Sequence, residues 1–272
     1  LTQGPTIKDK KQNLPEEDKF IEGNSEAAKQ LYKYVSLVAP TNMSVLIQGD
    51  SGTGKEHIAQ RIHNLSDRAG KPFIAIDCGA IPKELAASEF FGHIKGAFTG
   101  ALDNKVGALA AANGGTVFMD EIGNLSYDIQ VQLLRALQER IIRPIGSNQE
   151  ISVDIRLVAA TNEDLPTAIA EGSFREDLYH RINEFTIHIP NLTARNEDIP
   201  LFANFFLKQS NKELNKSFQG FSPEAALARQ QYSWPGNIRQ LKNVIRKATL
   251  LAQEENISYD DLGMEFLIQT TM

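Results

Sequence analysis

The sequence has almost no cysteine and no long apolar run. Cys78 is the single cysteine among 272 residues, so no disulfide can form within the chain, which fits a reducing compartment. No apolar stretch approaches the ~18 residues of a membrane-spanning helix, and no apolar signal segment stands at the start. We therefore expect a soluble, cytoplasmic protein that makes no contact with a membrane.

Excess positive charge is also missing. Lys and Arg total 28 against 34 Asp and Glu, which gives a formal net charge of -6. A domain that holds DNA through its overall field is expected to be basic, so the charge speaks against direct nucleic-acid binding. The five histidines show no metal-ligand spacing with the cysteine, and we expect them to be structural or surface residues.

Short apolar strands alternate with helical patterns over the first two-thirds of the chain. The strand candidates are 43–47, 73–76, 116–119, 155–160 and 185–189. Apolar residues recur at helical spacing between several of them, for example over 129–137. This alternation predicts an α/β fold with a five-stranded parallel sheet between helices.

After about residue 190 the strand pattern stops. Ser222 is followed by Pro223, an N-cap serine with proline at the first helical position, and a second helical pattern begins near Asn237. We expect a small all-helical subdomain here. The expected divisions are a linker or cloning-derived end (1–20), an α/β subdomain (21–190), a helical subdomain (191–256) and a C-terminal linker (257–272).

A glycine-rich turn joins the first strand candidate to a helix. Gly49 to Lys55 fit the pattern G-x-x-x-x-G-K, with Asp50, Ser51, Gly52, Thr53 and Gly54 between them. Glycine is needed there because the backbone must wrap closely around phosphates with its amides pointing inward, and Lys55 adds a charge that reaches the β- and γ-phosphates. Glu56 stands where the general pattern has the Ser or Thr that binds magnesium. The turn predicts a nucleotide-phosphate site.

Two carboxylates end the third strand candidate. Asp120 and Glu121 directly follow the apolar residues 117–119. An Asp at a strand tip can hold hydrated Mg²⁺, and the adjacent Glu can polarise the attacking water. A solvated acidic turn is the plain alternative, but the phosphate loop upstream favours the catalytic interpretation.

Further polar residues lie beyond the fourth strand candidate. Asn162 follows residues 155–160, where it either orients the water and senses the γ-phosphate or simply ends the strand. Arg175 and Arg181 stand six residues apart, and arginine is suited to neutralising charge on a transferring phosphoryl group. The alternative for the arginines is a solvated helix face with acidic partners nearby.

One hexapeptide is not needed by ATPases in general. It is Gly96-Ala97-Phe98-Thr99-Gly100-Ala101, within residues 90–101. In this position it resembles the signature of the sigma-54-dependent transcriptional activators, the bacterial enhancer-binding proteins. The resemblance extends over about residues 20–255 and makes Glu56 the family's usual residue. It includes the segments 49–56, 114–121, 159–162, 174–178 and 234–239.

The resemblance implies an AAA+ P-loop NTPase with a helical lid, which hydrolyses ATP with Mg²⁺. The loop from Gly49 to Glu56 would cradle ATP, Asp120 would bind Mg²⁺ and Glu121 would activate water, with Asn162 as the first sensor. The family acts as a ring of six or seven subunits that remodels the closed promoter complex of the sigma-54 RNA polymerase holoenzyme.

The resemblance also implies roles outside the phosphate site. Arg175 and Arg181 would be fingers that reach into the neighbouring subunit's site, and Arg239 would be the second sensor, on the lid. Phe98 and Thr99 would contact the sigma factor at a loop tip. The family adds a regulatory domain, as in response regulators, and a helix-turn-helix domain. We expect both outside this chain, so that DNA is contacted only through a domain that the chain lacks.

Three positions depart from the family's pattern. The family has Asn where Asp77 stands, and its amide can donate a hydrogen bond to the water-activating Glu, whereas an ionised carboxylate only accepts. Asp77 is therefore a switch candidate: near Glu121 it would repel that carboxylate and raise basal hydrolysis, or share a proton with it. The alternative is that Asp77 faces solvent without effect. Ile94 stands where the family has Glu, and Thr193-Ala194 stand where it has Arg-Glu. We expect these departures to affect the rate of ATP hydrolysis and its coupling to the sigma factor.

Two other functions stay open. Residues 222–251 could pass for a basic helix-turn-helix that binds duplex DNA, against which the acidic net charge speaks. The chain could also be a nucleotide-binding switch that no longer hydrolyses, against which the presence of Glu121, Arg175 and Arg181 speaks.

Overall fold

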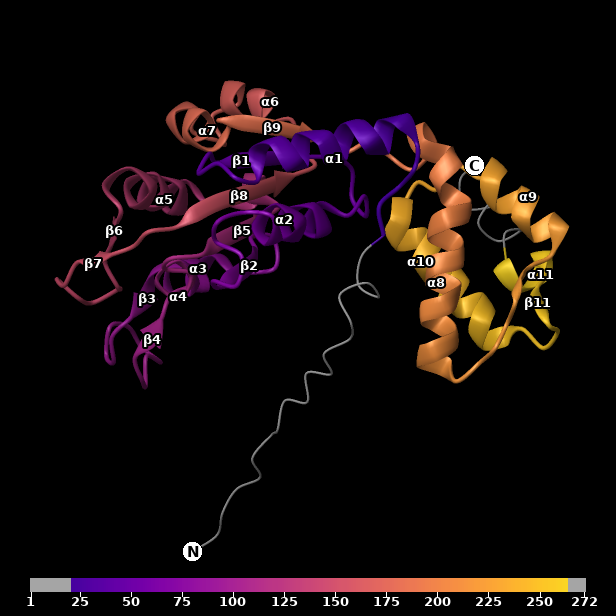
Figure 1. Cartoon of the computed structure of the whole chain (residues 1–272). Helices are drawn as coiled ribbons and strands as arrows, with labels where there is room; N and C mark the ends of the chain where they lie inside the picture. Colours follow the sequence, from indigo (N-terminus) through magenta and orange to yellow (C-terminus); the bar gives the residue numbers. More distant parts are fainter. Residues whose placement is uncertain (1–20, 264–272) are drawn as a thin grey trace, which may run out of the picture.

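The structure, a computed structural model, describes residues 21–263 and centres on a five-stranded sheet (Figure 1). The strand order is β2-β5-β8-β1-β9, and each neighbouring pair is parallel. The strands are β1 (Val45–Gln48), β2 (Phe73–Asp77), β5 (Thr116–Asp120), β8 (Arg156–Thr161) and β9 (Phe185–His188). The predicted α/β fold with a parallel sheet is confirmed.

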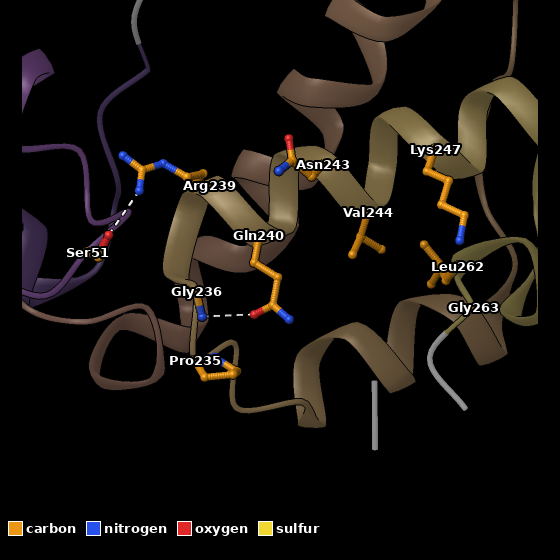
Figure 2. Close-up of a pocket in the computed structure, with 10 residues that line it drawn as sticks. All are labelled: Ser51, Pro235, Gly236, Arg239, Gln240, Asn243, Val244, Lys247, Leu262 and Gly263. Carbon is orange, nitrogen blue, oxygen red and sulfur yellow. Dashed lines mark hydrogen bonds between the residues drawn. The ribbon is translucent and has the colours of Figure 1, made fainter. Parts of the chain in front are cut away.

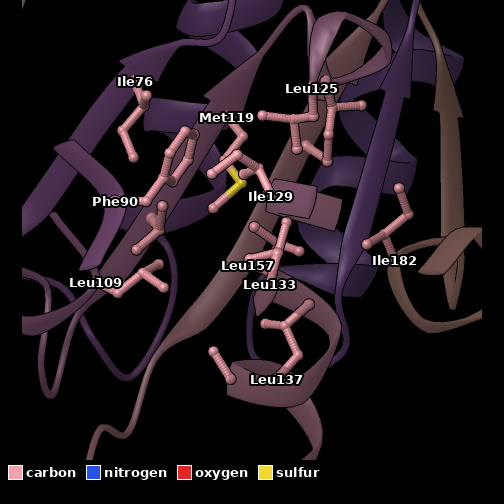
Figure 3. Packing of buried hydrophobic residues seen from close by; sticks show 14 of the residues in the cluster. Ile76, Phe90, Leu109, Met119, Leu125, Ile129, Leu133, Leu137, Leu157 and Ile182 are labelled. Carbon is pink, nitrogen blue, oxygen red and sulfur yellow. The ribbon is translucent and has the colours of Figure 1, made fainter. Parts of the chain in front are cut away.

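Helices cover both faces of the sheet. They are α1 (Glu26–Val38), α2 (Lys55–Asn64), α3 (Lys83–Phe91), α4 (Ala108–Ala111), α5 (Tyr127–Glu139), α6 (Leu165–Ala170) and α7 (Glu176–Ile182), with a 3-10 turn η2 (Ile122–Asn124). Because successive strand residues point to opposite faces, Met119 packs with α3 and α5 on one face (Figure 3), and Phe118 packs with α1 and α2 on the other. Every residue of β8 is buried, as expected for a central parallel strand.

Two small hairpins project from the sheet. One is β3 (Gly92–His93) with β4 (Lys105–Val106), and the other is β6 (Ile141–Ile142) with β7 (Ile151–Ser152). The loop with the hexapeptide 96–101 lies between β3 and β4. Ile94 N donates to Ile145 O at 3.1 Å, and Ile145 N donates to Gly92 O at 2.9 Å. The second hairpin therefore braces the base of the hexapeptide loop.

The helical subdomain has its own hydrophobic core. Its elements are η3 (Thr193–Asp198), α8 (Ile199–Leu214), β10 (Gly220–Phe221), α9 (Pro223–Gln231), α10 (Asn237–Leu251), β11 (Asn256–Ile257) and α11 (Tyr259–Leu262). Trp234, Leu241 and Ile245 are buried in this core. Ser222 caps α9 as predicted, since its side chain accepts a hydrogen bond from Ala225 N.

The helical subdomain differs from its prediction in two respects. It contains a two-residue parallel pair, β10 with β11, and so is not wholly helical. Residues 257–262, expected as a linker, form β11 and α11, and Ile257 and Leu262 are buried in the lid core. The linkers expected over 1–20 and 264–272 lie outside the described residues. Within residues 21–263, no helix is long and apolar enough to cross a membrane.

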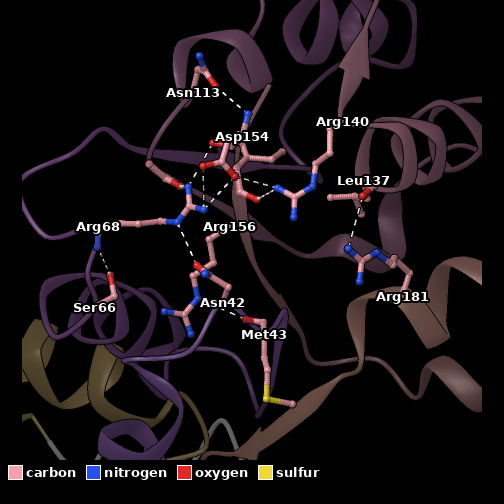
Figure 4. Close-up of polar contacts among 12 residues, drawn as sticks. Asn42, Met43, Ser66, Arg68, Asn113, Leu137, Arg140, Asp154, Arg156 and Arg181 are labelled. Carbon is pink, nitrogen blue, oxygen red and sulfur yellow. Dashed lines mark hydrogen bonds and ion pairs between the residues drawn. The ribbon is translucent and has the colours of Figure 1, made fainter. Parts of the chain in front are cut away.

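A buried arginine ties α1 to the sheet. Arg156, at the start of β8, is 2% exposed. It donates to Ala39 O at 2.6 Å, to Val38 O at 2.8 Å and to Met43 O at 3.3 Å, and so binds carbonyls at the end of α1 and before β1. Burial lowers the pKa of Arg156 to about 10, so the side chain remains a cation at neutral pH. Figure 4 shows Arg156 and Met43 together with the more exposed Arg140–Asp154 pair.

We expect Arg156→Met to lower the free energy of unfolding by about 3 kcal/mol, because carbonyls at the end of α1 lose their partner and stay buried. Arg140→Met is the matched control. Its 2.9 Å ion pair with Asp154 is exposed, so its loss should cost less than about 1 kcal/mol. Urea denaturation followed by circular dichroism measures both. Equal losses in the two variants would contradict the role of Arg156.

Candidate active site

The glycine-rich turn lies between β1 and α2. Gly52 and Gly54 have φ values of 78° and 99°, a conformation that glycine adopts without strain. In the described part of the chain, no side-chain hydrogen bond caps the N-terminus of α2. A Cβ on Gly52 would lie only 2.4 Å from Gly236 O, so the lid approaches the turn as closely as it does because residue 52 is glycine.

Lys55 begins α2 inside this turn. Its ammonium donates to Gly49 O at 2.9 Å and to Asp50 O at 3.3 Å, and the residue is 8% exposed. Burial lowers the pKa of Lys55, against the opposing pull of Asp120 and Glu121. An anion would stabilise this buried ammonium more strongly than the two carbonyl oxygens do, and a phosphate in the turn would provide that anion.

Carboxylates gather at the ends of β5 and β2. Asp77 lies opposite Asp120 in the parallel register, and Asp120 Oδ1 accepts a hydrogen bond from Glu121 N at 3.0 Å. The buried Cys78 thiol has its pKa raised to about 12, by burial first and then by Asp77, Asp120 and Glu121. The field here is negative, which suits a divalent cation.

Asn162 lies at the same edge of the sheet. It follows β8, the strand between β5 and β1, and its side chain is exposed. The fold thus brings the sequence-predicted Lys55, Asp120, Glu121 and Asn162 to the carboxyl ends of three adjacent strands.

The two predicted finger arginines lie at α7. Arg175 pairs with both carboxylate oxygens of Asp177, at 2.9 and 2.6 Å, and donates to Tyr127 OH at 2.6 Å. The hydrogen bond from Arg175 lowers the pKa of Asp177. Arg181 pairs with Glu184 and donates to Leu137 O at 3.4 Å. Within residues 21–263, no hydrogen bond or ion pair joins either arginine to the chain's own glycine-rich turn.

The lid contacts the glycine-rich turn through the start of α10. Arg239 donates from Nη1 to Ser51 Oγ at 2.9 Å and from its backbone N to Gly52 O at 3.2 Å. Asn237 Nδ2 donates to Ser51 O at 3.1 Å. Figure 2 shows Arg239 and Ser51 beside a cavity of about 440 Å³ that Gln240 and other residues of α10 also line.

Arg195 is a residue of this site that sequence reasoning did not assign. It is 3% exposed, donates to Thr53 O at 3.1 Å and has its guanidinium 5.6 Å from the centre of the Phe202 ring. Its Nε is buried and has no hydrogen-bond partner among residues 21–263. The residue lines a cavity of about 60 Å³ between α2 and the lid, together with Tyr32, Gly54, Ile58, Phe206 and Ile238. Sequence alone gave no signal, because its burial depends on the lid's position.

The hexapeptide loop lies away from the phosphate turn (Figure 1). Phe98 is 39% exposed, with its ring 5.0 Å from the His93 ring, and Thr99 is exposed. Gly100 has φ 102°, which a residue with a side chain adopts only with strain. The loop thus presents an aromatic and a hydroxyl side chain to the surroundings.

Comparison with known proteins agrees with this arrangement. A family described as "Sigma-54 interaction domain" matches residues 21–188, and one described as "AAA+ ATPase lid domain" matches residues 193–271. "Transcriptional regulatory protein GlrR" of Escherichia coli (strain K12) is 52% identical over 229 residues, which are 84% of this chain and 52% of that protein. ZraR of the same strain is 48% identical over 242 residues, 89% of this chain and 55% of that protein.

Solved structures lead to the same family. NtrX from Brucella abortus in complex with ATP superposes with a TM-score of 0.84 and 36% identity, over 90% of this chain and 55% of that one. NtrX in complex with ADP gives the same TM-score and identity. The chain spans about half the length of the curated relatives it matches. It belongs to the sigma-54 interaction family of AAA+ domains, which is found in bacterial enhancer-binding transcriptional regulators.

Proposed function

We propose that this chain hydrolyses ATP with Mg²⁺ in a homo-oligomeric ring of six or seven subunits, and that the ring remodels the closed promoter complex of sigma-54 RNA polymerase in the cytoplasm. The observation that carries this proposal is that the strand order β5-β8-β1 brings Asp120, Glu121 and the glycine-rich turn with Lys55 to one edge of the sheet. In this proposal the α/β subdomain spans residues 21–190 and the lid spans residues 191–256, and DNA would be contacted only through a domain outside this chain.

The site fits ATP along its length. The uncapped N-terminus of α2, the backbone from Gly49 to Glu56, and Lys55 suit the phosphates. The mostly apolar lining of the cavity beside Gly54 suits a nucleobase, for which the cavity of about 60 Å³ would have to widen. The unpartnered Nε of Arg195 suits an acceptor atom of the nucleotide. Arg239 would approach the phosphates from the lid, which its hydrogen bond to Ser51 Oγ supports. NtrX, a relative, has been solved in complex with ADP and with ATP, which supports a nucleotide as the ligand of this site.

The acidic strand end fits Mg²⁺. Asp120 would hold the ion, since a carboxylate oxygen is a ligand that Mg²⁺ prefers and the hydrogen bond from Glu121 N to Oδ1 fixes the orientation of the group. Magnesium bound with ATP neutralises charge on the phosphates. Glu121 accepts the proton of the attacking water, and Asn162, between β5 and β1, orients that water.

The arginines complete the site of the next subunit. Arg175 is partly exposed and bound to Asp177 and Tyr127 of its own chain, not to its own glycine-rich turn. Arg181 is likewise paired with Glu184 of its own chain. In a neighbouring subunit's site each arginine would exchange this carboxylate partner for the charge on the transferring phosphoryl group.

Direct DNA binding by α9 and α10 has less support. Arg239 is engaged with Ser51 of the glycine-rich turn, and Arg246 pairs with Glu213 of α8. The buried face of α10 packs in the lid core, through Leu241 and Ile245. These contacts assign the helix pair to the lid.

We expect Lys55→Ala to abolish ATP binding, because the phosphates lose the ammonium inside the turn. Glu121→Gln should bind ATP normally yet hydrolyse it about 10²- to 10⁴-fold more slowly, since only water activation is lost. Isothermal titration measures binding, and phosphate release measures turnover. Parental turnover in Glu121→Gln would support a different base, and loss of binding in both variants would remove the separate role of Glu121.

Phe98→Ala and Thr99→Ala should leave basal ATP turnover within about twofold while sigma-54 engagement falls by more than tenfold, as expected for interface anchors. Leu227→Ala, an exposed leucine on α9, is the control and should change neither. Pull-down of sigma-54 with a transition-state analogue of ATP hydrolysis measures engagement. Trapping of sigma-54 by Phe98→Ala at parental affinity would show that the loop is not the contact.

A further inference from the structure

The Glu121 carboxylate has a defined resting place in the structure. Asn124 Nδ2 donates a hydrogen bond to Glu121 Oε2 at 3.1 Å. A Cβ built on Gly79 would lie 2.3 Å from the same oxygen and 3.1 Å from Asn124 Nδ2. The carboxylate therefore occupies space that any side chain at residue 79 would fill, and Asn124 donates to it there.

This resting place lies on the side of β5 away from the glycine-rich turn. Gly79 follows β2, which is the outer neighbour of β5 in the order β2-β5-β8-β1-β9. The glycine-rich turn follows β1, two strands away from β5 in the opposite direction. A carboxylate that lies against Gly79 is thus turned away from the position that the γ-phosphate would take near Lys55.

Asp77 does not hold Glu121 in this position. Its Oδ1 accepts hydrogen bonds from Gly79 N at 3.0 Å and from Ala80 N at 3.1 Å, so it fixes the turn after β2. The same oxygen is 3.5 Å from the Cβ built on Gly79, which places it within ~6 Å of Glu121 Oε2. The hydrogen bond to Glu121 comes from Asn124, and Asp77 shapes the turn against which the carboxylate lies.

The backbone of Glu121 supports this arrangement. Its φ and ψ are 53° and 46°, a left-handed conformation that is uncommon for a residue with a side chain. The 3-10 turn η2 follows at once and brings Asn124 back within reach, with Asn124 N donating to Glu121 O at 3.0 Å. The side-chain and backbone bonds between the two residues therefore form one local unit.

We propose that Asn124 is a positioning residue that holds Glu121 in a resting orientation and so restrains hydrolysis until the carboxylate turns toward the nucleotide. The inference rests on the proposed role of Glu121 as the base. A single exposed hydrogen bond is weak enough to break in every cycle. Loss of the bond should leave more of the population with Glu121 turned toward the γ-phosphate.

The first test measures ATP turnover of Asn124→Ala at a protein concentration high enough for ring assembly to be complete. We expect basal kcat to rise about three- to tenfold, the range that the loss of one solvent-exposed hydrogen bond of ordinary strength provides, with KM for ATP unchanged. Asn113→Ala is the matched control. Asn113 Oδ1 accepts from Asp154 N at 2.7 Å, before β8 begins, and its loss should not change turnover.

The second test removes the resting place and leaves the donor intact. Gly79→Ala places a methyl group where Glu121 Oε2 lies, and the flexible end of Glu121 can move aside. We expect the same rise in kcat. Crystal structures without nucleotide should show the carboxylate against Gly79 in the parent and displaced from it in both variants.

Both variants are repeated in the Glu121→Gln background, where the rise should vanish because the base is gone. Unchanged or lower kcat in Asn124→Ala, or a rise that persists with Glu121→Gln, would overturn the positioning role. Parental turnover in Glu121→Gln alone would instead overturn the proposed base, so the two failures are distinguishable.

Discussion

Parallel pairing of the strands is the constraint on which the rest of the site depends. In a parallel sheet all carboxyl ends lie at one edge, so residues far apart in the sequence meet there without a dedicated contact. β1 delivers the glycine-rich turn and Lys55, β5 delivers Asp120 and Glu121, and β8 delivers Asn162. The sheet is stiff because its central strands are buried on both faces, which keeps these groups at fixed spacing.

The lid adds the second side of the site. Asn237 and Arg239 bind backbone and side-chain oxygens of the turn that would hold the phosphates, and Arg195 binds Thr53 O beside the apolar cavity. A nucleotide placed between them would replace or strengthen these contacts, so phosphate chemistry and lid position are expected to be coupled. The hexapeptide loop is braced by a hairpin that follows α5, and α5 begins shortly after Glu121. A continuous segment thus connects the proposed base to the loop's support.

The sequence predicted the parts of the site that local pattern determines. Apolar runs ending in Gly49 or in Asp120 and Glu121 are short-range signals, and so are the N-cap at Ser222 and the parallel sheet inferred from alternation. Tertiary contacts were not predictable in this way. The bond from Asn124 to Glu121 needs the left-handed backbone at Glu121, and the burial of Arg195 and Arg156 needs the packing of distant segments. The strand β11 and the helix α11 are too short to show a period.

Completion of the proposed hydrolysis site between subunits is tested most directly by mixing two inactive variants. Arg175→Ala leaves a subunit with an intact glycine-rich turn but no finger, and Lys55→Ala leaves the finger but no nucleotide site. Each alone should be inactive, since a finger supplied by a neighbour contributes about 10³- to 10⁵-fold. Rings assembled from both should regain measurable ATP turnover, with a maximum at an intermediate ratio. No recovery at any ratio, in rings shown to contain both subunits, would contradict the account.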